Sequence, residues 1–483
     1  MVINKELKSS LYLAIVPILA FVALVFTTRF FIGISPDSIM YVSAAQSFID
    51  TGELRSIFDG LPLQYMTHYP PGLSLFISFF SLFTSNLYDA ARLLNAISIF
   101  ALLFSVGLIT RKYLSTSYII SLQALLMLNL SLFSIYQMLW TEPIYIILSI
   151  FSLVTLNLFV NTKNIKYLLI TSVLLSTSVF VRYIGVSLII TSVIYIWIAL
   201  KNEKSIERIK YIFILGFISS SSFLYWTIRN YILVANPTDR HFSFHPMTME
   251  YYEEWLTSTT TFFIGLTSNQ LGDVLSYIIG AIIIIALLYY SIQVFRKSSL
   301  ELNYIFILYP TVYLAFLFIS NTFFDFTPLY YRTLSPVYIF FTISIFTFIW
   351  GNAKLKKILK LSLITIFLLL YGSRFTINLV KYNDGKGLSS KAYMIPNTIS
   401  ELEKLNSETK VYTNEAERLY LLTNGRLAEH LRNIQGASED EFIIVYFYNG
   451  RHFDSGILSQ QGYSSELIVK TDDLIIQKYV KHH

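Results

Sequence analysis

Long apolar runs separated by short polar turns dominate the first 380 residues of the 483-residue chain. A helix needs about 20 mostly apolar residues to cross a bilayer, and about 17 to 25 are tolerated. Because lipid offers the backbone no hydrogen-bond partners, each run is expected to be a helix. The expected spans are 11–33, 92–110, 117–137, 143–160, 166–181, 183–200, 210–233, 274–295, 303–320, 334–350 and 359–380. The pattern predicts an α-helical polytopic membrane protein with about eleven spans.

The hydrophobic pattern changes at about residue 381, where bilayer-length runs end. Residues 395–405 have helical spacing, and the apolar run 441–448 is bounded by Asn449 and Gly450, as is typical of a buried strand. Segments 467–470 and 474–479 predict a terminal hairpin. The chain is therefore expected to consist of a transmembrane domain, 1–380, and a small soluble α/β domain, 381–483.

The apolar run from Pro71 to Leu87 decides the membrane topology. If this run lies along the outer face without crossing, all the clusters of basic residues between spans fall on one side. They are Lys5/Lys8, Arg111/Lys112, Lys163/Lys166, Lys201 to Lys210, Arg296/Lys297 and Lys354 to Lys360. The positive-inside rule favours this arrangement. We therefore expect a cytoplasmic amino terminus, an outer loop 34–91, and an extracytoplasmic carboxy-terminal domain on the plasma or inner membrane.

The composition agrees with a membrane protein and excludes several other classes. Hydrophobic residues make up 54% of the chain and charged residues 14%, against about 25% charged in soluble domains. There is no cysteine, which excludes disulfides and thiolate metal sites. The net charge of +6 comes from the short basic clusters between spans, so it does not indicate a nucleic-acid partner.

Polar residues near span ends collect on the expected outer face. They are Asp37, Asp89, Arg92, Glu142, Arg182, Arg229 and Arg332. Acidic groups at a bilayer edge are costly unless they face water or a polar cavity, which makes Asp37 a functional candidate. The structural alternative is that Ser35 and Asp37 cap a helix beginning near Ser38. The gathering of these polar residues on one face of the membrane favours chemistry on the outer face.

The order of these residues resembles the GT-C superfamily of integral-membrane glycosyltransferases, in the branch of the aminoarabinose transferases and protein O-mannosyltransferases. The resemblance covers roughly residues 1–350. The matching features, in chain order, are Ser35-Pro36-Asp37-Ser38 with Tyr41 downstream, Tyr69-Pro70-Pro71-Gly72, Ala91-Arg92-Leu93, Thr141-Glu142-Pro143, Arg182 in a tight bend, and Tyr331-Arg332-Thr333-Leu334-Ser335-Pro336. The chain departs from the family in two places: Ser38 follows Asp37 where a second acid is common, and Tyr69 precedes the Pro-Pro pair, with His68 one position earlier.

The resemblance implies an inverting transfer of a sugar from a polyprenyl-phosphate carrier to a glycan, lipid or protein acceptor on the outer face. Asp37 takes the place of the general base, which removes the acceptor hydroxyl proton. The residues implied to hold the donor phosphate are Arg92, Arg182, Arg332, His68 and Tyr69. For each arginine the alternative is snorkelling to the interface, or pairing with Asp89 or Glu142.

Glu142 has two interpretations. An acid before Pro143 at the start of a span is favourable at a helix amino terminus, whereas the resemblance implies a second carboxylate orienting the acceptor, an arginine or a metal. Tyr41, Tyr331 and Trp255 are expected to line the substrate site, with the Trp255 loop covering the sugar.

A metal site is the less favoured interpretation of the loop before Trp255. His241 and His245 lie near the acids Glu250, Glu253 and Glu254, but Pro246 interrupts a continuous helical face. No metal or other cofactor is expected, with a divalent cation as the open alternative.

Other functions remain open from the sequence. A flippase or transporter of lipid-linked sugars would favour inverted repeats and broken helices at mid-membrane, and neither is visible in the pattern. A polysaccharide polymerase is the closest enzymatic alternative, and a non-catalytic scaffold would leave Asp37 replaceable. The expected partners are the lipid-linked donor, the acceptor and membrane lipids.

Overall fold

The computed structural model describes residues 5–58, 61–239, 242–296, 302–324, 329–351, 356–405, 409–436, 439–448 and 456–481. The chain forms two compact units. The first, the bundle unit, contains Met1–Thr27, Thr67–Leu73 and Arg92–Tyr382. The second contains Thr28–Met66, Ser74–Ala91 and Asn383–His483, and we call it the outer unit after the side of the membrane on which the sequence predicts it. Most of the expected first outer loop therefore belongs to the same unit as the carboxy-terminal segment.

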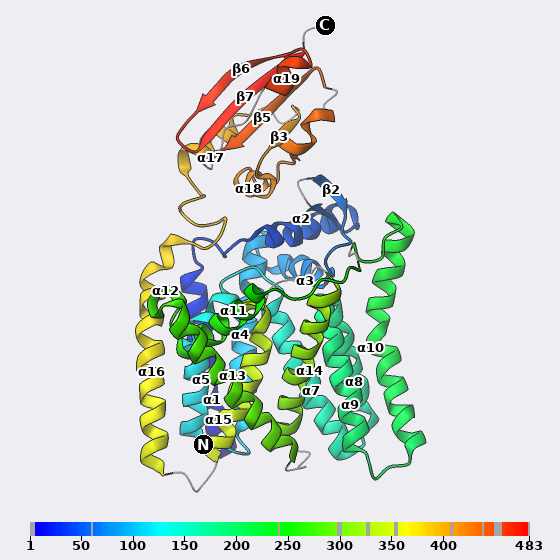
Figure 1. The fold of residues 1–483 in the computed structure, drawn as a ribbon, viewed down its shortest axis with the longest axis vertical. Coiled ribbons are helices and arrows are strands. Elements are labelled where there is room, and N and C mark those ends of the chain that lie inside the picture. The colour runs from blue at the N-terminus through cyan, green and yellow to red at the C-terminus, as the bar shows by residue number, and fades with distance from the viewer. Residues whose placement is uncertain are drawn as a thin grey trace. The chain divides into compact units, whose positions relative to one another are not determined.

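The bundle unit is helical, and each expected span forms helix over most of its length in the part of the chain that the structure describes. The first expected span, 11–33, is helical only to Thr27, and the span 117–137 is broken at Asn129. The long helices are α1 (Lys5–Thr27), α4 (Leu87–Thr110), α5 (Thr116–Leu128), α6 (Leu130–Tyr136), α7 (Glu142–Thr162), α8 (Ile165–Val181), α9 (Val186–Ala199), α10 (Ser205–Val234), α13 (Asp273–Arg296), α14 (Leu302–Phe323), α15 (Tyr331–Gly351) and α16 (Lys357–Val380). Shorter elements are η2 (Tyr183–Gly185), α11 (Met249–Ile264) and α12 (Ser268–Leu271). Figure 1 shows the long helices running lengthwise beside one another.

The chain is a multi-pass membrane protein, with fewer full-length spans than the sequence pattern predicts. Among the described residues, seven helices are long and apolar enough to cross a membrane, or eight if the bent pair α5 and α6 forms one span. That pair bends by 68° where the helix breaks at Asn129. The apolar parts of α1, α8 and α9 are shorter, partly because Arg182 ends α8.

The run between Pro71 and Leu87 is too short to cross the membrane as one helix. It forms α3 (Gly72–Phe80) followed by the turn η1 (Ser81–Phe83). At a rise of 1.5 Å per residue, α3 is about 14 Å long, less than half of the roughly 30 Å hydrocarbon core. The expectation that this run does not cross agrees with this length.

Basic turns and the acidic Glu142 lie at opposite ends of the bundle unit. Lys163, which follows α7, forms an ion pair with Glu203 at 3.4 Å, and Lys360 of α16 donates to the carbonyl of Trp350 at 3.0 Å. Helix α7 begins at Glu142 and α15 begins at Tyr331, so their other ends carry these basic contacts. The separation of charge seen in the sequence is therefore present in these helices of the bundle unit.

The outer unit begins with a helix and a hairpin. Helix α2 (Pro36–Thr51) ends at Gly52, whose φ of 76° favours glycine, and strands β1 (Arg55–Phe58) and β2 (Leu61–Tyr65) pair antiparallel. Ile34 joins this part to the carboxy-terminal segment, because its N–H donates to the carbonyl of Lys386 at 3.2 Å and its carbonyl accepts from Leu388 at 2.8 Å.

The carboxy-terminal part of the outer unit is the expected small α/β domain. Its mixed sheet has the order β4-β3-β5-β7-β6, in which β3 is parallel to β4 and β5, and β7 is antiparallel to β5 and β6. The elements are η3 (Lys381–Asp384), α17 (Pro396–Glu403), β3 (Val411–Thr413), α18 (Ala416–Leu422), β4 (Glu429–His430), η4 (Leu431–Gly436), β5 (Glu441–Phe447), α19 (Gly456–Gln460), β6 (Tyr463–Lys470) and β7 (Leu474–Lys481). Alternate residues of β5 bury both faces: Val445 packs with Leu419, and Phe442 stacks on Tyr479.

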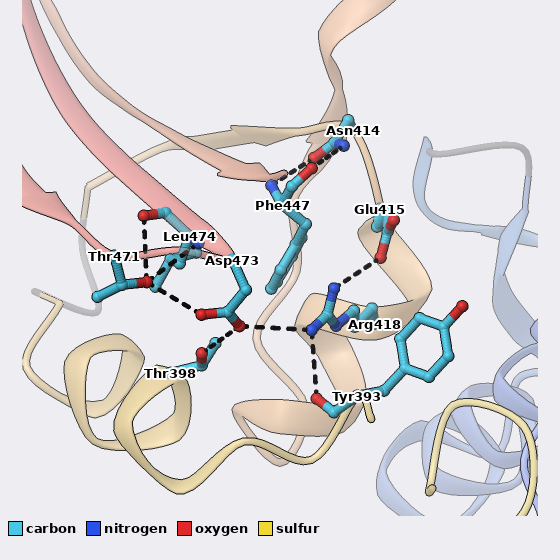
Figure 2. Close-up of polar contacts among 9 residues, drawn as sticks. All are labelled: Tyr393, Thr398, Asn414, Glu415, Arg418, Phe447, Thr471, Asp473 and Leu474. Atoms are coloured by element: carbon cyan, nitrogen blue, oxygen red, sulfur yellow. Dashed lines mark hydrogen bonds and ion pairs between the residues drawn. The ribbon is translucent and has the colours of Figure 1, made fainter. Parts of the chain in front are cut away.

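A buried arginine joins the helices of this domain to its sheet. Arg418 is 5% exposed and lies over the ring of Phe447 at 4.3 Å (Figure 2). Its guanidinium contacts Glu415 at 3.3 Å and Asp473 at 3.8 Å, and Asp473 accepts from Thr398. Because the contacts come from α17, α18 and the turn before β7, this network fixes the domain's packing.

Candidate active site

A buried carboxylate at the start of α7 binds two arginines. Glu142 is fully buried, and its Oε1 accepts from Nε of Arg332 at 2.6 Å and pairs with Nη1 of Arg182. Two guanidinium groups against one carboxylate leave one formal positive charge in this group of three, which we call the Glu142 cluster. The sequence offered pairing with Glu142 as the structural alternative for these arginines, and the structure contains these pairs.

A tight bend positions Arg182 at the end of α8. The N–H of Arg182 donates to Ser178 at 2.9 Å, and its carbonyl accepts from Gly185 at 2.8 Å. A side chain at Gly185 would lie 2.7 Å from the backbone nitrogen of Val179, so this bend needs a glycine. The close approach of η2 to α8 holds Arg182 beside Glu142.

The first turn of α15 presents Arg332 to Glu142. The guanidinium of Arg332 lies over the ring of Trp140, 4.3 Å from its centroid. The neighbouring Tyr331 packs against Ile135, Met138 and Trp140. A cation over an indole ring is attracted to its face, and the planar guanidinium is well suited to this stacking. Tyr331, expected in the substrate site, therefore supports the residue next to it.

Buried tyrosines surround the Glu142 cluster, although no motif in the sequence singles them out. Tyr145 lies one turn after Glu142, and its hydroxyl is 2.9 Å from that of Tyr309. The guanidinium of Arg182 is 5.8 Å from the Tyr145 ring centroid. Tyr313 donates to the carbonyl of Thr333 at 2.7 Å, next to Arg332. The available signal was helical spacing: Tyr145 follows Glu142 by three positions, and Tyr313 follows Tyr309 by four.

Arg92 binds the end of α1. Its Nη2 donates to the carbonyl of Val25 at 2.6 Å, an interaction that suits a cation at a helix carboxy terminus. One turn later, buried Asn95 donates to the carbonyls of Tyr136 and Met138 at 2.8 and 2.7 Å. Asn95, which no motif in the sequence singles out either, therefore fixes the segment that leads to Trp140.

The loop Thr67–Leu73 lies against the residues that flank Arg182. Tyr183 donates to the carbonyl of Thr67 at 3.3 Å, and a side chain on Gly72 would lie 2.5 Å from the carbonyl oxygen of Phe180. Within this loop the rings of His68 and Tyr69 meet edge to face at 4.7 Å, and Nδ1 of His68 is 3.7 Å from Oδ2 of Asp239. Thus His68 and Tyr69 lie in the same unit as the Glu142 cluster.

Trp255 and His245 lie elsewhere in the bundle unit. Trp255, on α11, packs its ring against Phe318 at 5.2 Å, and Nδ1 of His245 is 3.1 Å from the carbonyl oxygen of Thr322. Among the described residues, no group of three or more His, Cys, Asp or Glu side chains has a geometry that could hold a metal ion. His241, which the sequence paired with His245, lies outside the described residues.

Asp37 and Tyr41 belong to the outer unit. Asp37 is half-buried in the first turn of α2, and Tyr41 follows one turn later on the same face. The backbone N–H of the capping residue Ser35 donates to Oγ of Ser38 at 2.9 Å. Because Ser35 and Ser38 cap this helix reciprocally, the cap does not need the Asp37 carboxylate.

Comparisons with solved structures identify the fold. ArnT from Cupriavidus metallidurans bound to undecaprenyl phosphate superposes with a TM-score of 0.61 at 10% identity, over 97% of each chain. ArnT in the apo state gives a TM-score of 0.60 at 10% identity, over 96% of this chain and 97% of that one. The archaeal oligosaccharyltransferase AglB from Archaeoglobus fulgidus, in complex with an inhibitory peptide and a dolichol-phosphate, gives 0.51 at 11% identity, over 86% of this chain and 64% of its own.

Sequence comparisons add no relative. No protein-family description matches the chain, and no curated protein matches it either. The chain shares the fold of ArnT and, over most of its length, of AglB, which agrees with the fold that the order of motifs along the sequence predicts.

Proposed function

We propose that this chain, which has the GT-C fold, is a glycosyltransferase. It would move a sugar from a polyprenyl-phosphate carrier to an acceptor at the outer membrane face. The observation that carries the proposal is the Glu142 cluster, which holds two arginines on one buried carboxylate. ArnT, which shares this fold, was solved bound to undecaprenyl phosphate. A polyprenyl-phosphate sugar is the donor class that suits both the positive charge of the Glu142 cluster and the shared fold.

Arg182 and Arg332 are proposed to bind the donor phosphate. A guanidinium group binds phosphate through paired N–H donors, and the excess positive charge of the cluster favours an anion. The bond from Arg332 to Glu142 and the stack on Trp140 fix the plane of that guanidinium before substrate arrives. A phosphate leaving with the electron pair of the broken glycosidic bond is stabilised by groups already in place.

Glu142 is assigned a positioning role. Its Oε1 accepts a hydrogen bond from Arg332 and forms an ion pair with Arg182, and its full burial keeps the three charges close. A carboxylate oxygen occupied in this way orients the phosphate-binding groups and leaves proton transfer to another residue.

Asp37 is the proposed general base. In an inverting displacement the acceptor hydroxyl oxygen forms the new bond to the sugar carbon, its proton passes to the base, and the carrier phosphate departs. A base must come within about 2.6–3.2 Å of that hydroxyl. Asp37 is suitable because Ser35 and Ser38 already cap α2, and because it is half-buried beside Tyr41.

The test is a transfer assay with the purified full-length protein. Radiolabelled sugars on polyprenyl phosphate are supplied in detergent with glycan, lipid and peptide acceptors. The proposal expects label to move from the carrier to one acceptor class, with the anomeric configuration inverted.

The alternatives give different outcomes in the same preparation. A flippase would leave the carrier–sugar bond intact while translocating the labelled lipid in proteoliposomes, and a polymerase would give products that lengthen with time. Absence of transfer together with donor translocation would overturn the proposal.

A further inference from the structure

The outer unit contains a cavity that the proposed chemistry does not use. It has a volume of about 590 Å³ and lies between α2, strand β2, the start of α4 with the residues that lead into it, and the end of α18 with the turn that follows. Its size is within the roughly 300–1,000 Å³ range of small-molecule sites. All the residues that line it belong to the outer unit.

Polar groups in this cavity are available for a ligand. Among the described residues, the hydroxyls of Tyr88 and Tyr420 and the side-chain amide of Asn424 have no hydrogen-bond partner, and all three line the cavity. Tyr420 is only 7% exposed. Burial, together with the nearby Asp50 carboxylate, raises the pKa of the Tyr420 hydroxyl to about 12, so this group stays protonated and able to donate at neutral pH.

The shape of the cavity is held by local hydrogen bonds. Asn424 and Gly425 have φ values of 52° and 117°, and the N–H of Gly425 donates to the carbonyl of Tyr420 at 2.9 Å. On the opposite side, Nε2 of Gln46 donates to Oδ1 of Asp50 at 2.8 Å. The carboxylate is therefore oriented and can accept further hydrogen bonds through its other lone pairs.

The lining chemistry selects a class of ligand. No Lys, Arg or His is among the described residues that line the cavity, whereas Asp50 is, so an anion is disfavoured. Hydroxyls, an amide and a carboxylate match the many hydroxyl groups of a sugar, and tyrosine rings offer apolar faces for its C–H groups. We propose that this cavity binds a neutral saccharide that is part of the acceptor.

The donor sugar does not fit this site. It is joined directly to a phosphate, so it must lie where the phosphate is bound, and the cavity lacks a basic group for that purpose. Calling the saccharide the acceptor rests on the proposed function; the binding itself does not.

Saturation-transfer NMR on the full-length protein in detergent tests the binding without donor. The probes are maltotriose, mannotriose and triacetylchitotriose at millimolar concentration, with glucose 6-phosphate as the anionic comparison. At least one neutral trisaccharide should bind, and Tyr420→Phe combined with Asn424→Ala should weaken it roughly tenfold or more, because two hydrogen bonds are lost. Tyr393→Phe removes a hydroxyl outside the cavity and should leave binding unchanged.

Three results would overturn the inference: no neutral trisaccharide binding, binding unaffected by the double variant, or stronger binding of glucose 6-phosphate. The role as acceptor site is tested separately in the transfer assay, where the double variant should raise the acceptor KM and leave the donor KM unchanged. If the wild type binds a saccharide but transfers no sugar, the proposed function is contradicted and the inference of a saccharide-binding site still holds.

Discussion

The Nε of Arg332 and Oε1 of Glu142 lie 2.6 Å apart although 190 residues separate them in the sequence. With Arg182 they bring together the ends of three helices, α7, α8 and α15, in the buried part of the bundle unit. Charges held in this way are costly to bury unless every partner is present. The Glu142 cluster therefore holds these three helix ends together and is also the proposed phosphate site.

Replacing Glu142 with glutamine should destabilise the protein. Glu142→Gln leaves two guanidinium groups close together without their counter-charge, and breaking a buried pair typically costs about 3–5 kcal/mol. The thermal unfolding midpoint in detergent should fall clearly below that of the wild type. Glu53→Gln is the matched control, because Glu53 pairs with Arg55 at the surface and should matter little. Equal midpoints for Glu142→Gln and the wild type would contradict the account of the cluster.

Replacing Arg332 with lysine should weaken use of the donor. Arg332→Lys keeps the charge but loses the planar donors and the stack on Trp140. A lost charge-assisted hydrogen bond corresponds to roughly a ten- to hundredfold fall in kcat/KM for the donor. Arg229→Lys is the control, since Arg229 also stacks on a tryptophan, Trp226, at 4.6 Å. Similar kinetics for the two variants would remove Arg332 from the phosphate site.

The sequence predicts the helices and the charged residues that are candidates for the site. It does not predict which of these residues contact one another, because tertiary packing determines those contacts. Apolar runs locate the spans, because a helix in lipid satisfies its own backbone. The pattern does not show that Arg182 and Arg332 share Glu142 while Arg92 binds the carbonyl of Val25, since all three arginines occupy similar span ends. Side-chain partners across long sequence separations are set by packing, which periodicity does not encode.

The same limit applies to the outer unit and to the aromatic residues. Strands such as β5 follow from their apolar runs, but the grouping of α2 with the carboxy-terminal domain depends on contacts made by Ile34 with residues more than 350 positions away. The ring contact of Trp255 with Phe318 is likewise set by packing, and the expectation that Trp255 covers the sugar stays a prediction.

Gly72 should be essential for packing the loop that carries His68 and Tyr69 against helix α8. A Cβ at this position would lie 2.5 Å from the carbonyl oxygen of Phe180, so Gly72→Ala must move the loop or α8, at a cost of about 1–3 kcal/mol. Gly216→Ala is the control, because nothing lies within 4 Å of its Cβ in helix α10. The thermal midpoint should fall for the first variant and stay level or rise for the second. The reverse order would show that the close approach is not required.

The distribution of basic residues predicts the orientation of the chain. In this cysteine-free protein, cysteines placed at exposed Thr162 and Ser465 can be labelled with an impermeant maleimide. In intact cells or spheroplasts, only the Ser465→Cys site should react, and both should react after lysis. Reaction at Thr162→Cys in intact cells would reverse the topology and move the proposed chemistry to the other face.

The general base is tested with Asp37→Asn, which keeps size and polarity but cannot take the acceptor proton. General-base catalysis typically contributes about 10²–10⁴-fold, so kcat should fall at least about a hundredfold. Donor binding should change little, because the phosphate is assigned to arginines. Asp384→Asn, at an exposed acid that pairs with Lys391 at 3.7 Å, is the control and should retain full activity.

The measurement that tests the central claim most directly is therefore the single-turnover rate of sugar transfer by Asp37→Asn from a radiolabelled polyprenyl-phosphate donor. The account predicts a well-folded protein that binds donor normally and transfers at least about a hundred times more slowly than the wild type. Near-normal transfer would contradict it, since a residue that merely favours the first turn of α2 can be replaced by asparagine without loss of chemistry.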